Sequence, residues 1–335
     1  MVGYNNTNME NLPFVTALIV MRNEHNYIER SLMSFVNQTY PKDNYEIIVV
    51  DGGSDDGSLD IVNNIIQKYS TERFHISILD NPKRILATGW NLGIKAAKGE
   101  YVTRIDAHAV ADPDFIEKSV EVMMRTKASC VGGKLTSISE DGTDSIVSKI
   151  LSSPFGVGNS SFRVSNSEGV VDTAVYGLYK KDLFERIGYF DESMVRSQDL
   201  EMHGRIRRDG GSFYFSPVIH STYYTRNTIK KMLKQAYGNG KWNMVLIKRG
   251  VSGLSLRHLV PFIFVLYVLL SVAGGFVYHW IWWLCLGVLF LHLMLGVIFS
   301  IKKTAKVKEI LAMPFLFMAL HFAYGLGYFS GLLIK

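Results

Sequence analysis

Three aspartates in the N-terminal half of the chain each follow an apolar run: Asp51, Asp80 and Asp106. Runs such as Glu46–Val50 are typical of buried strands, and helical patterns separate them. Ligands of open α/β sheets bind beyond the carboxyl ends of the strands, so the three carboxylates are predicted to lie at one edge. Capping of the following helix is the alternative role for any single one of them, and it also suits Asp55.

Asp106 and His108 are separated by one residue and lie at the end of the predicted strand Tyr101–Ile105. Because side chains alternate along extended backbone, the carboxylate and the imidazole should point the same way. Beside a diphosphate, this pair suits Mn²⁺ or Mg²⁺, with phosphate oxygens as further ligands. His220, which follows Pro217, is a further candidate ligand, although a histidine satisfied by hydrogen bonds is the more frequent case.

The segment Asp51–Gly57 is rich in glycine, but it contains neither a G-x-G-x-x-G nor a Walker-type phosphate motif. A dinucleotide oxidoreductase or a P-loop enzyme is therefore not indicated. The Asp51 carboxylate can accept a hydrogen bond from a base or a ribose hydroxyl, and Gly52 and Gly53 would let the ligand approach. Arg84, with its planar guanidinium, is the candidate contact for a diphosphate or a base.

Asp199 begins a predicted helix that continues to Arg208. An acidic residue at a helix N-terminus is favoured by the helix dipole alone. The functional alternative is a general base, which would take the proton from an acceptor hydroxyl as that hydroxyl attacks a sugar carbon.

The net charge of +6 comes from clustered basic residues, and the chain has only two cysteines. Two cysteines cannot form a disulfide framework or a zinc site, which favours a reducing compartment. The N-terminus lacks the apolar core of a secretory signal. The basic clusters flank apolar segments, which indicates the cytoplasmic side of a membrane rather than a nucleic-acid surface. They are Lys230, Lys231, Lys234, Lys241, Lys248, Arg249 and Arg257, and Lys302, Lys303, Lys306 and Lys308.

Three apolar segments close the sequence: 259–278, 280–300 and 310–334. Each has about the 20 residues that a membrane-spanning helix requires. A hairpin of buried core helices is the alternative, but the segments have no polar face to cover it. Three crossings would leave Lys335 on the side of the membrane opposite to the domain that precedes the first span.

The chain is accordingly divided into three parts. Residues 1–227 are predicted to form a cytoplasmic α/β domain with a mostly parallel, Rossmann-like sheet, because strand and helix patterns alternate and the strands are continuously apolar. Residues 228–257 are predicted to form an amphipathic basic segment at the membrane surface. Residues 258–335 are predicted to form the membrane domain.

Five motifs in order resemble the inverting glycosyltransferases of family 2, which have the GT-A fold. They are VTALIVMRNE, EIIVVDGGSDDGS, NPKRILATGWNLG, RIDAHA and QDLEMHGRIRRDGG. SPFGVG, beginning at Ser153, and the later Val171-Asp172-Thr173 resemble the branch typified by succinoglycan-biosynthesis glycosyltransferases. The resemblance extends over about residues 14 to 250 and is specific as a series.

The resemblance implies that Asp51 contacts the nucleoside, with uridine favoured, and that Arg84 contacts the donor. Asp106 and His108 stand in place of the family's Asp-x-Asp metal motif, so His108 departs from the pattern. Asp199 matches the catalytic base.

The family pattern also suggests roles for four other residues. Glu24, which closes the first motif, is predicted to be on the donor side. Gln198 replaces the glutamate that precedes the base in the family and is predicted on the acceptor side. Gln235 and Trp242 loosely resemble the Gln…Arg-Trp motif of membrane relatives and are predicted on the acceptor side, unless they only belong to a surface helix.

The predicted activity is hexosyl transfer from a nucleotide-diphosphate sugar to a lipid-linked saccharide, in exopolysaccharide or cell-surface glycan synthesis. A polysaccharide assembly complex is a candidate partner. Three alternatives remain: a polyprenyl-phosphate glycosyltransferase, whose phosphate acceptor needs no base; a processive synthase, for which three spans are few; and a non-enzymatic scaffold that binds nucleotide-sugar.

Overall fold

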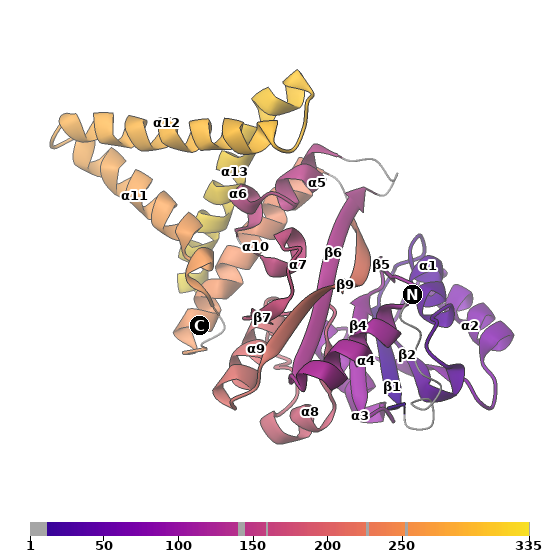
Figure 1. Cartoon of the computed structure of the whole chain (residues 1–335). Helices are drawn as coiled ribbons and strands as arrows, with labels where there is room; N and C mark the ends of the chain where they lie inside the picture. Colours follow the sequence, from indigo (N-terminus) through magenta and orange to yellow (C-terminus); the bar gives the residue numbers. More distant parts are fainter. Residues whose placement is uncertain (1–11, 140–144, 159, 226–227, 252–253, 335) are drawn as a thin grey trace. The chain divides into compact units, whose positions relative to one another are not determined.

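The structure is a computed structural model that describes residues 12–139, 145–158, 160–225, 228–251 and 254–334 (Figure 1). The chain folds into two compact units. The first unit comprises Met1–Leu135, Ser165–Gln198 and Ile206–Tyr223. The second unit comprises Thr136–Val164, Asp199–Arg205 and Tyr224–Lys335.

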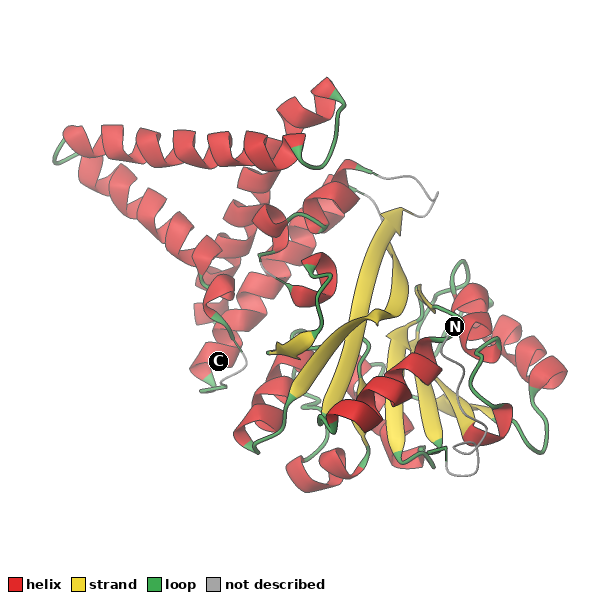
Figure 2. Cartoon of the chain, viewed as in Figure 1, coloured by secondary structure: helices red, strands yellow, loops and turns green. Residues whose placement is uncertain are grey.

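The first unit is built on a sheet, drawn in yellow in Figure 2, in which four parallel strands have the order β3-β2-β1-β4. Nearly every residue of β1 and β2 is buried, so both faces of the sheet are covered, as continuously apolar strands require. The predicted parallel strands are therefore confirmed, as one part of a mixed sheet. The strands are β1 (Val15–Met21), β2 (Tyr45–Asp51), β3 (Ile76–Asp80) and β4 (Tyr101–Asp106).

Helices connect these strands. α1 buries Ile28, Leu32 and Phe35, which recur at helical spacing. α3 packs closely on β1, because a Cβ built on Gly89 would lie 2.6 Å from Val20. The connecting elements are α1 (Ile28–Val36), a short 3₁₀ helix (Lys42–Asn44), α2 (Ser58–Tyr69), α3 (Leu86–Ala96) and α4 (Phe115–Thr126).

Beyond β4 the sheet becomes antiparallel, in the order β4-β8-β6-β9-β5, and β7 pairs with β9. These strands bring residues from later in the chain next to the end of β4. The elements are β5 (Ala109–Ala111), β6 (Cys130–Ser139), β7 (Gly169–Val171), β8 (Leu178–Lys180), α8 (Asp182–Ile187), α9 (Gln198–Arg208) and β9 (Phe213–Thr225).

The second unit is helical. Within the described residues, three of its helices are long and apolar enough to cross a membrane: 256–275, 280–301 and 307–332. The elements are α5 (Ile146–Leu151), α6 (Pro154–Val157), α7 (Ser161–Val164), α10 (Ile229–Lys248), a 3₁₀ turn (Leu256–His258), α11 (Val260–Gly275), α12 (Trp280–Ile301) and α13 (Val307–Leu332).

The short helices α5 and α6 pack on α12 and α13. The Phe155 ring lies among four rings, those of His292 and Phe299 of α12 and Phe317 and His321 of α13, with centroids 4.9 to 5.3 Å away. Nε2 of His321 donates to the carbonyl of Phe155 at 2.9 Å. The segment Thr136–Val164, which precedes β7 in the sequence, thus belongs to the same unit as the apolar helices.

Candidate functional site

The carboxyl ends of the parallel strands meet at one edge of the sheet. Asp51 is in register with Met21 and Asp80, and Asp106 is in register with Val20. The prediction that Asp51, Asp80 and Asp106 share an edge is therefore confirmed. In open α/β sheets, this is the edge at which ligands bind.

Asp51 is buried and shapes the loop that follows β2. Its carboxylate accepts hydrogen bonds from the backbone N–H groups of Gly53 and Ser54, each at 3.1 Å to Oδ2, and from the Ser54 hydroxyl at 2.6 Å. A carboxylate has about four acceptor positions, so these bonds leave it able to accept from a ligand as well. The loop is thereby fixed before any ligand arrives.

Arg84 lies against this loop. A Cβ built on Gly53 would stand 3.3 Å from Nε of Arg84 and 3.4 Å from Nη2. Gly53 also has a φ of 75°, which residues with a side chain rarely adopt. The structure thus brings Arg84 and the Asp51 loop together, as expected for two groups that contact one ligand.

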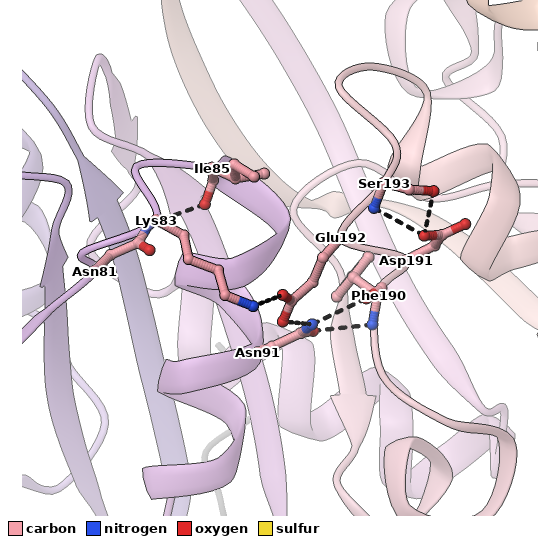
Figure 3. A network of polar contacts seen from close by, with 8 residues as sticks. All are labelled: Asn81, Lys83, Ile85, Asn91, Phe190, Asp191, Glu192 and Ser193. Atoms are coloured by element: carbon pink, nitrogen blue, oxygen red, sulfur yellow. Dashed lines mark hydrogen bonds and ion pairs between the residues drawn. The ribbon is translucent and has the colours of Figure 1, made fainter.

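A network of hydrogen bonds supports the loop that carries Arg84 (Figure 3). The Asn91 amide donates to the carbonyl of Phe190 and accepts from its N–H, both at 2.9 Å. Glu192 accepts from Asn91 at 3.1 Å and pairs with Lys83 at 2.7 Å. The bond from Lys83, and then that from Asn91, lower the pKa of Glu192, so the carboxylate stays ionised. Segment 190–193 is thereby tied to the loop beside Arg84.

Asp106 accepts a 2.9 Å hydrogen bond at Oδ2 from the hydroxyl of Tyr176. Tyr176 is buried, and its φ of 47° is unusual for a residue with a bulky side chain. Burial, and then the charge of Asp106, raise the pKa of Tyr176 well above its ordinary value, so the hydroxyl remains a donor. Two residues before Asp106, the buried Arg104 guanidinium stacks 3.4 Å from the centre of the Trp90 ring.

His108 lies between two partners. Nδ1 is 3.3 Å from Oε1 of Glu24, and Nε2 is 3.1 Å from the hydroxyl of Tyr223. A carboxylate only accepts, so the proton is assigned to Nδ1, which leaves Nε2 as the nitrogen with a lone pair. This carboxylate–imidazole arrangement is the one that orients histidine ligands of metals.

The set of side chains suits a divalent cation only in part. Asp106 and His108 supply an oxygen and a nitrogen donor, but among the described residues no group of three or more His, Cys, Asp or Glu side chains is arranged to hold a metal ion. Ligand phosphates would have to complete the coordination. His220 is not part of such a group either, and its Nδ1 is 2.9 Å from Oδ2 of Asp112.

The remaining predicted residues lie on helices. Gln198 is buried, and its amide donates to the carbonyl of Val195 at 3.0 Å. Asp199 occupies the first turn of α9, in the part of that helix that belongs to the second unit. Gln235, which is exposed, and Trp242, which is partly buried, are in α10 of the second unit.

Two tyrosines were missed by reasoning from the sequence. Tyr176 precedes β8 and Tyr223 lies in β9, so only the antiparallel pairing brings them to Asp106 and His108. Neither is in one of the five motifs, and no local pattern announces its role. The Asn91–Glu192 contact joins residues far apart in the sequence and was equally unforeseen.

Residues 16–188 match the family model for glycosyl transferase family 2, which covers more than half of the chain. The chain belongs to glycosyltransferase family 2. The resemblance seen in the motifs is thereby confirmed, and the protein is a glycosyltransferase.

Two of the relatives that cover three quarters or more of the chain bear on its function. The dolichyl N-acetyl-alpha-D-glucosaminyl phosphate 3-beta-D-2,3-diacetamido-2,3-dideoxy-beta-D-glucuronosyltransferase of Methanococcus voltae is 33% identical over 96% of this chain and 97% of its own length. The succinoglycan biosynthesis protein ExoA of Rhizobium meliloti is 27% identical over 75% of this chain and 76% of its own length. The second match agrees with the predicted branch of the family.

A solved structure has the same fold. The mannosyltransferase PcManGT of Pyrobaculum calidifontis, in complex with GDP-Man and Mn²⁺, matches 94% of this chain and 88% of its own chain with a TM-score of 0.61. Because the two sequences are only 16% identical, this match shows that the folds are alike and nothing more. The expected architecture, a GT-A domain followed by apolar helices, is confirmed.

Proposed function

We propose that this glycosyltransferase transfers a sugar, with inversion, from a uridine-diphosphate sugar to a saccharide carried by a membrane lipid. The observation that carries the proposal is the sheet edge at which Asp51, Arg84 and Asp106 gather. Asp51 would accept from the uracil or the ribose, and the Arg84 guanidinium would contact the base or the diphosphate.

The acceptor is inferred from the most extensively matching relative above. Its name gives a dolichyl-phosphate-linked N-acetylglucosamine as acceptor, and the alignment covers almost all of both chains. Apolar helices in this chain support an acceptor held at a membrane. The basic segments beside those helices support a cytoplasmic catalytic domain in a protein of the cell membrane.

The chemistry proposed is a single displacement at the anomeric carbon of the donor. An acceptor hydroxyl forms the new C–O bond while the bond from that carbon to the diphosphate oxygen breaks. Asp199 takes the hydroxyl proton, and the diphosphate leaves with the bonding electron pair. The acidic position at the start of α9 and the family pattern support this role.

A divalent cation is proposed at Asp106 and His108. When bound, the ion would neutralise charge that develops on the departing diphosphate. Glu24 would hold His108 by Nδ1–H, and the Tyr176 hydroxyl would fix one oxygen of Asp106. The structural relative's complex with Mn²⁺ supports a cation of this kind.

A polyprenyl-phosphate acceptor is the second candidate, because such an acceptor needs no base. A processive synthase remains open too. A role in exopolysaccharide synthesis, within an assembly complex, is supported only by the relative that functions in succinoglycan synthesis.

The test uses the purified full chain in lipid and a panel of nucleotide sugars. Release of nucleoside diphosphate is measured with Mn²⁺ present, with and without a lipid-linked saccharide. We expect one uridine-diphosphate sugar to be consumed faster when the acceptor is added. Equal rates for all donors, with no response to any acceptor, would contradict the proposal.

A further inference from the structure

The three apolar helices of the second unit join end to end as a triangle and do not form a parallel bundle (Figure 1). The turn 276–279 joins α11 to α12, and the loop 302–306 joins α12 to α13. The third corner is made by contact alone, between the end of α13 and the beginning of α11. This closed shape limits how many of the three can cross a bilayer.

The contacts at the third corner are specific. The Tyr328 hydroxyl donates to the carbonyl of His258 at 2.8 Å. The Phe262 ring stacks on Tyr328 with centroids 5.0 Å apart. A Cβ built on Gly325 would lie 2.5 Å from the carbonyl oxygen of Pro261. Residues in the last two turns of α13 thus lie at the level where α11 begins.

The beginning of α13 lies at the end of α12. A Cβ built on Gly296 of α12 would stand 2.9 Å from Cα of Pro314. If α11 and α12 cross the membrane in opposite directions, the start of α11 and the end of α12 are at the same face. Both ends of α13 are then at that face. A crossing α13 would instead place Tyr328 most of the roughly 30 Å hydrocarbon thickness away from His258.

The triangle by itself is compatible with any one of the three helices lying parallel to the membrane plane. The contacts of α10 distinguish among these three possibilities. α10 runs beside α13 in the same direction, with backbones in close contact: Gly240 lies against the carbonyl of Tyr324, and Gly331 lies against the carbonyl of Lys241. Nζ of Lys248 reaches the carbonyl of Leu332 at 3.1 Å.

α10 cannot enter the hydrocarbon layer. It contains five lysines, and a charged lysine is strongly disfavoured near the apolar centre of a bilayer. Because α13 is packed along α10, it stays at the depth of α10, in the interface. The lysines are Lys230, Lys231, Lys234, Lys241 and Lys248.

The charges outside the helices agree. Arg249 and Arg257 precede α11, and Lys302 and Lys303 follow α12, so a hairpin of these two spans puts all four on one face. At the opposite corner, Trp280 and Trp283 are exposed, as in an aromatic belt. Of the three helices, α13 is the least apolar and the most covered by protein.

We propose that only α11 and α12 cross the membrane, and that α13 lies beside α10 along the lipid–water interface on the side of the basic residues. The partner of this α10–α13 platform is the lipid surface, which exposed Leu311, Phe315 and Leu326 of α13 would contact. Chain positions before α11 and after α13 are then on the same side. This differs from the three crossings expected from length and apolarity, which contain no information on tilt.

Depth measurement with spin labels tests the orientation of α13. Single cysteines replace the exposed Leu311, Phe315 and Leu326 in the full chain reconstituted in liposomes, with Cys130→Ala and Cys285→Ala removing the native thiols. Residues 311 and 326 are separated by about 22 Å along the helix. A flat α13 gives similar depths, differing by less than about one helical turn of 5 Å.

The matched control is the series Trp283, Phe290 and Ile298, which are exposed on α12 and span the same 15-residue separation. A crossing α12 gives a label that passes from one interface through the centre toward the other. The proposal would be overturned if both helices gave constant depths, or if the labels of both helices passed through the centre of the bilayer.

Accessibility to a membrane-impermeant maleimide gives a second, independent readout of sidedness. Cysteines are placed at the exposed positions Lys306, Leu333 and Tyr278. We expect Lys306→Cys and Leu333→Cys to be labelled from the same side, and Tyr278→Cys from the other. Labelling of Leu333→Cys together with Tyr278→Cys, or of all three from one side, would overturn the proposal.

Discussion

The hydroxyl of Tyr176 donates a 2.9 Å hydrogen bond to Oδ2 of Asp106, although 70 residues separate the two. The bond places a buried neutral donor on the carboxylate that ends β4. One oxygen of Asp106 is therefore held in place, and the direction of the other is set by the first. A carboxylate that binds a metal or a diphosphate complex needs this kind of support.

Tyr176→Phe removes the hydroxyl with little change in shape. A hydrogen bond to a charged group contributes about 1.5 to 3 kcal/mol, so we expect kcat/KM to fall about 10- to 100-fold. Tyr45→Phe is the matched control, because the buried Tyr45 hydroxyl donates to the carbonyl of Phe35 and Tyr45 begins β2, at the end of the strand opposite to Asp51. Equal losses of activity in the two variants would mean that Tyr176 acts through stability alone.

The pH dependence of that loss follows from the protonation of Tyr176. Because burial raises its pKa, the neutral hydroxyl is favoured in the folded state and persists below and around the ordinary value of about 10. The ratio of wild-type to Tyr176→Phe activity should therefore be constant between about pH 6 and pH 9. A ratio that collapses to one within this range would show that the hydroxyl ionises there.

Glu24 is expected to act through His108. Glu24→Ala removes the carboxylate beside Nδ1, and loss of such a partner typically lowers metal affinity about 10- to 100-fold. Mn²⁺ binding is measured by electron paramagnetic resonance in the presence of uridine diphosphate. Glu29→Ala, an exposed change in the first turn of α1, is the control. Unchanged Mn²⁺ affinity in Glu24→Ala would remove Glu24 from the metal site.

Asn91→Ala should weaken the support of the loop that carries Arg84. Both backbone polar groups of Phe190 lose their partner, at about 1 to 3 kcal/mol for each group left buried and unpaired. We expect a lower thermal midpoint together with a higher KM for the donor. Asn44→Ala is the comparison, because the Asn44 amide also donates to a backbone carbonyl, that of Leu12. A donor KM equal to that of the control would separate this network from donor binding.

Asp199→Asn tests the proposed base. Loss of a general base lowers transfer about 100-fold or more, while donor affinity should stay within a few-fold. Asp209→Asn, which removes a carboxylate paired with Arg186 just beyond the same helix, serves as control. Turnover like that of the wild type would refute the assignment, and loss of donor binding would indicate a structural role instead.

The sequence predicted those site residues whose position follows from their own strand, and it missed those that are brought to the site by pairing between distant strands. Asp51, Asp80 and Asp106 were foreseeable because each ends an apolar strand, and parallel strands share an edge. Tyr176 and Tyr223 were not, because antiparallel pairing across the sheet brings them to Asp106 and His108. The Asp112 side chain that His220 contacts at 2.9 Å was likewise not foreseeable, because 108 residues separate the two in the chain.

The same distinction holds for the membrane helices. Length and apolarity identify the three helices, and the structure has them within a few residues of the predicted bounds. Their arrangement depends on contacts that no periodicity contains, such as the hydrogen bond from Tyr328 to His258. The glycines that let α13 lie against α10 become informative only once both helices are placed.

The proposed reaction transfers a single sugar to a saccharide on a lipid. Mass spectrometry of the reaction with purified full-length protein, Mn²⁺, a uridine-diphosphate sugar and a polyprenyl-phosphate-linked N-acetylglucosamine tests it most directly. We expect a lipid product heavier by one sugar residue, in equal amount to the uridine diphosphate released, and no product from unsubstituted polyprenyl phosphate. Addition of sugar to polyprenyl phosphate alone, with the lipid-linked saccharide left unchanged, would contradict it.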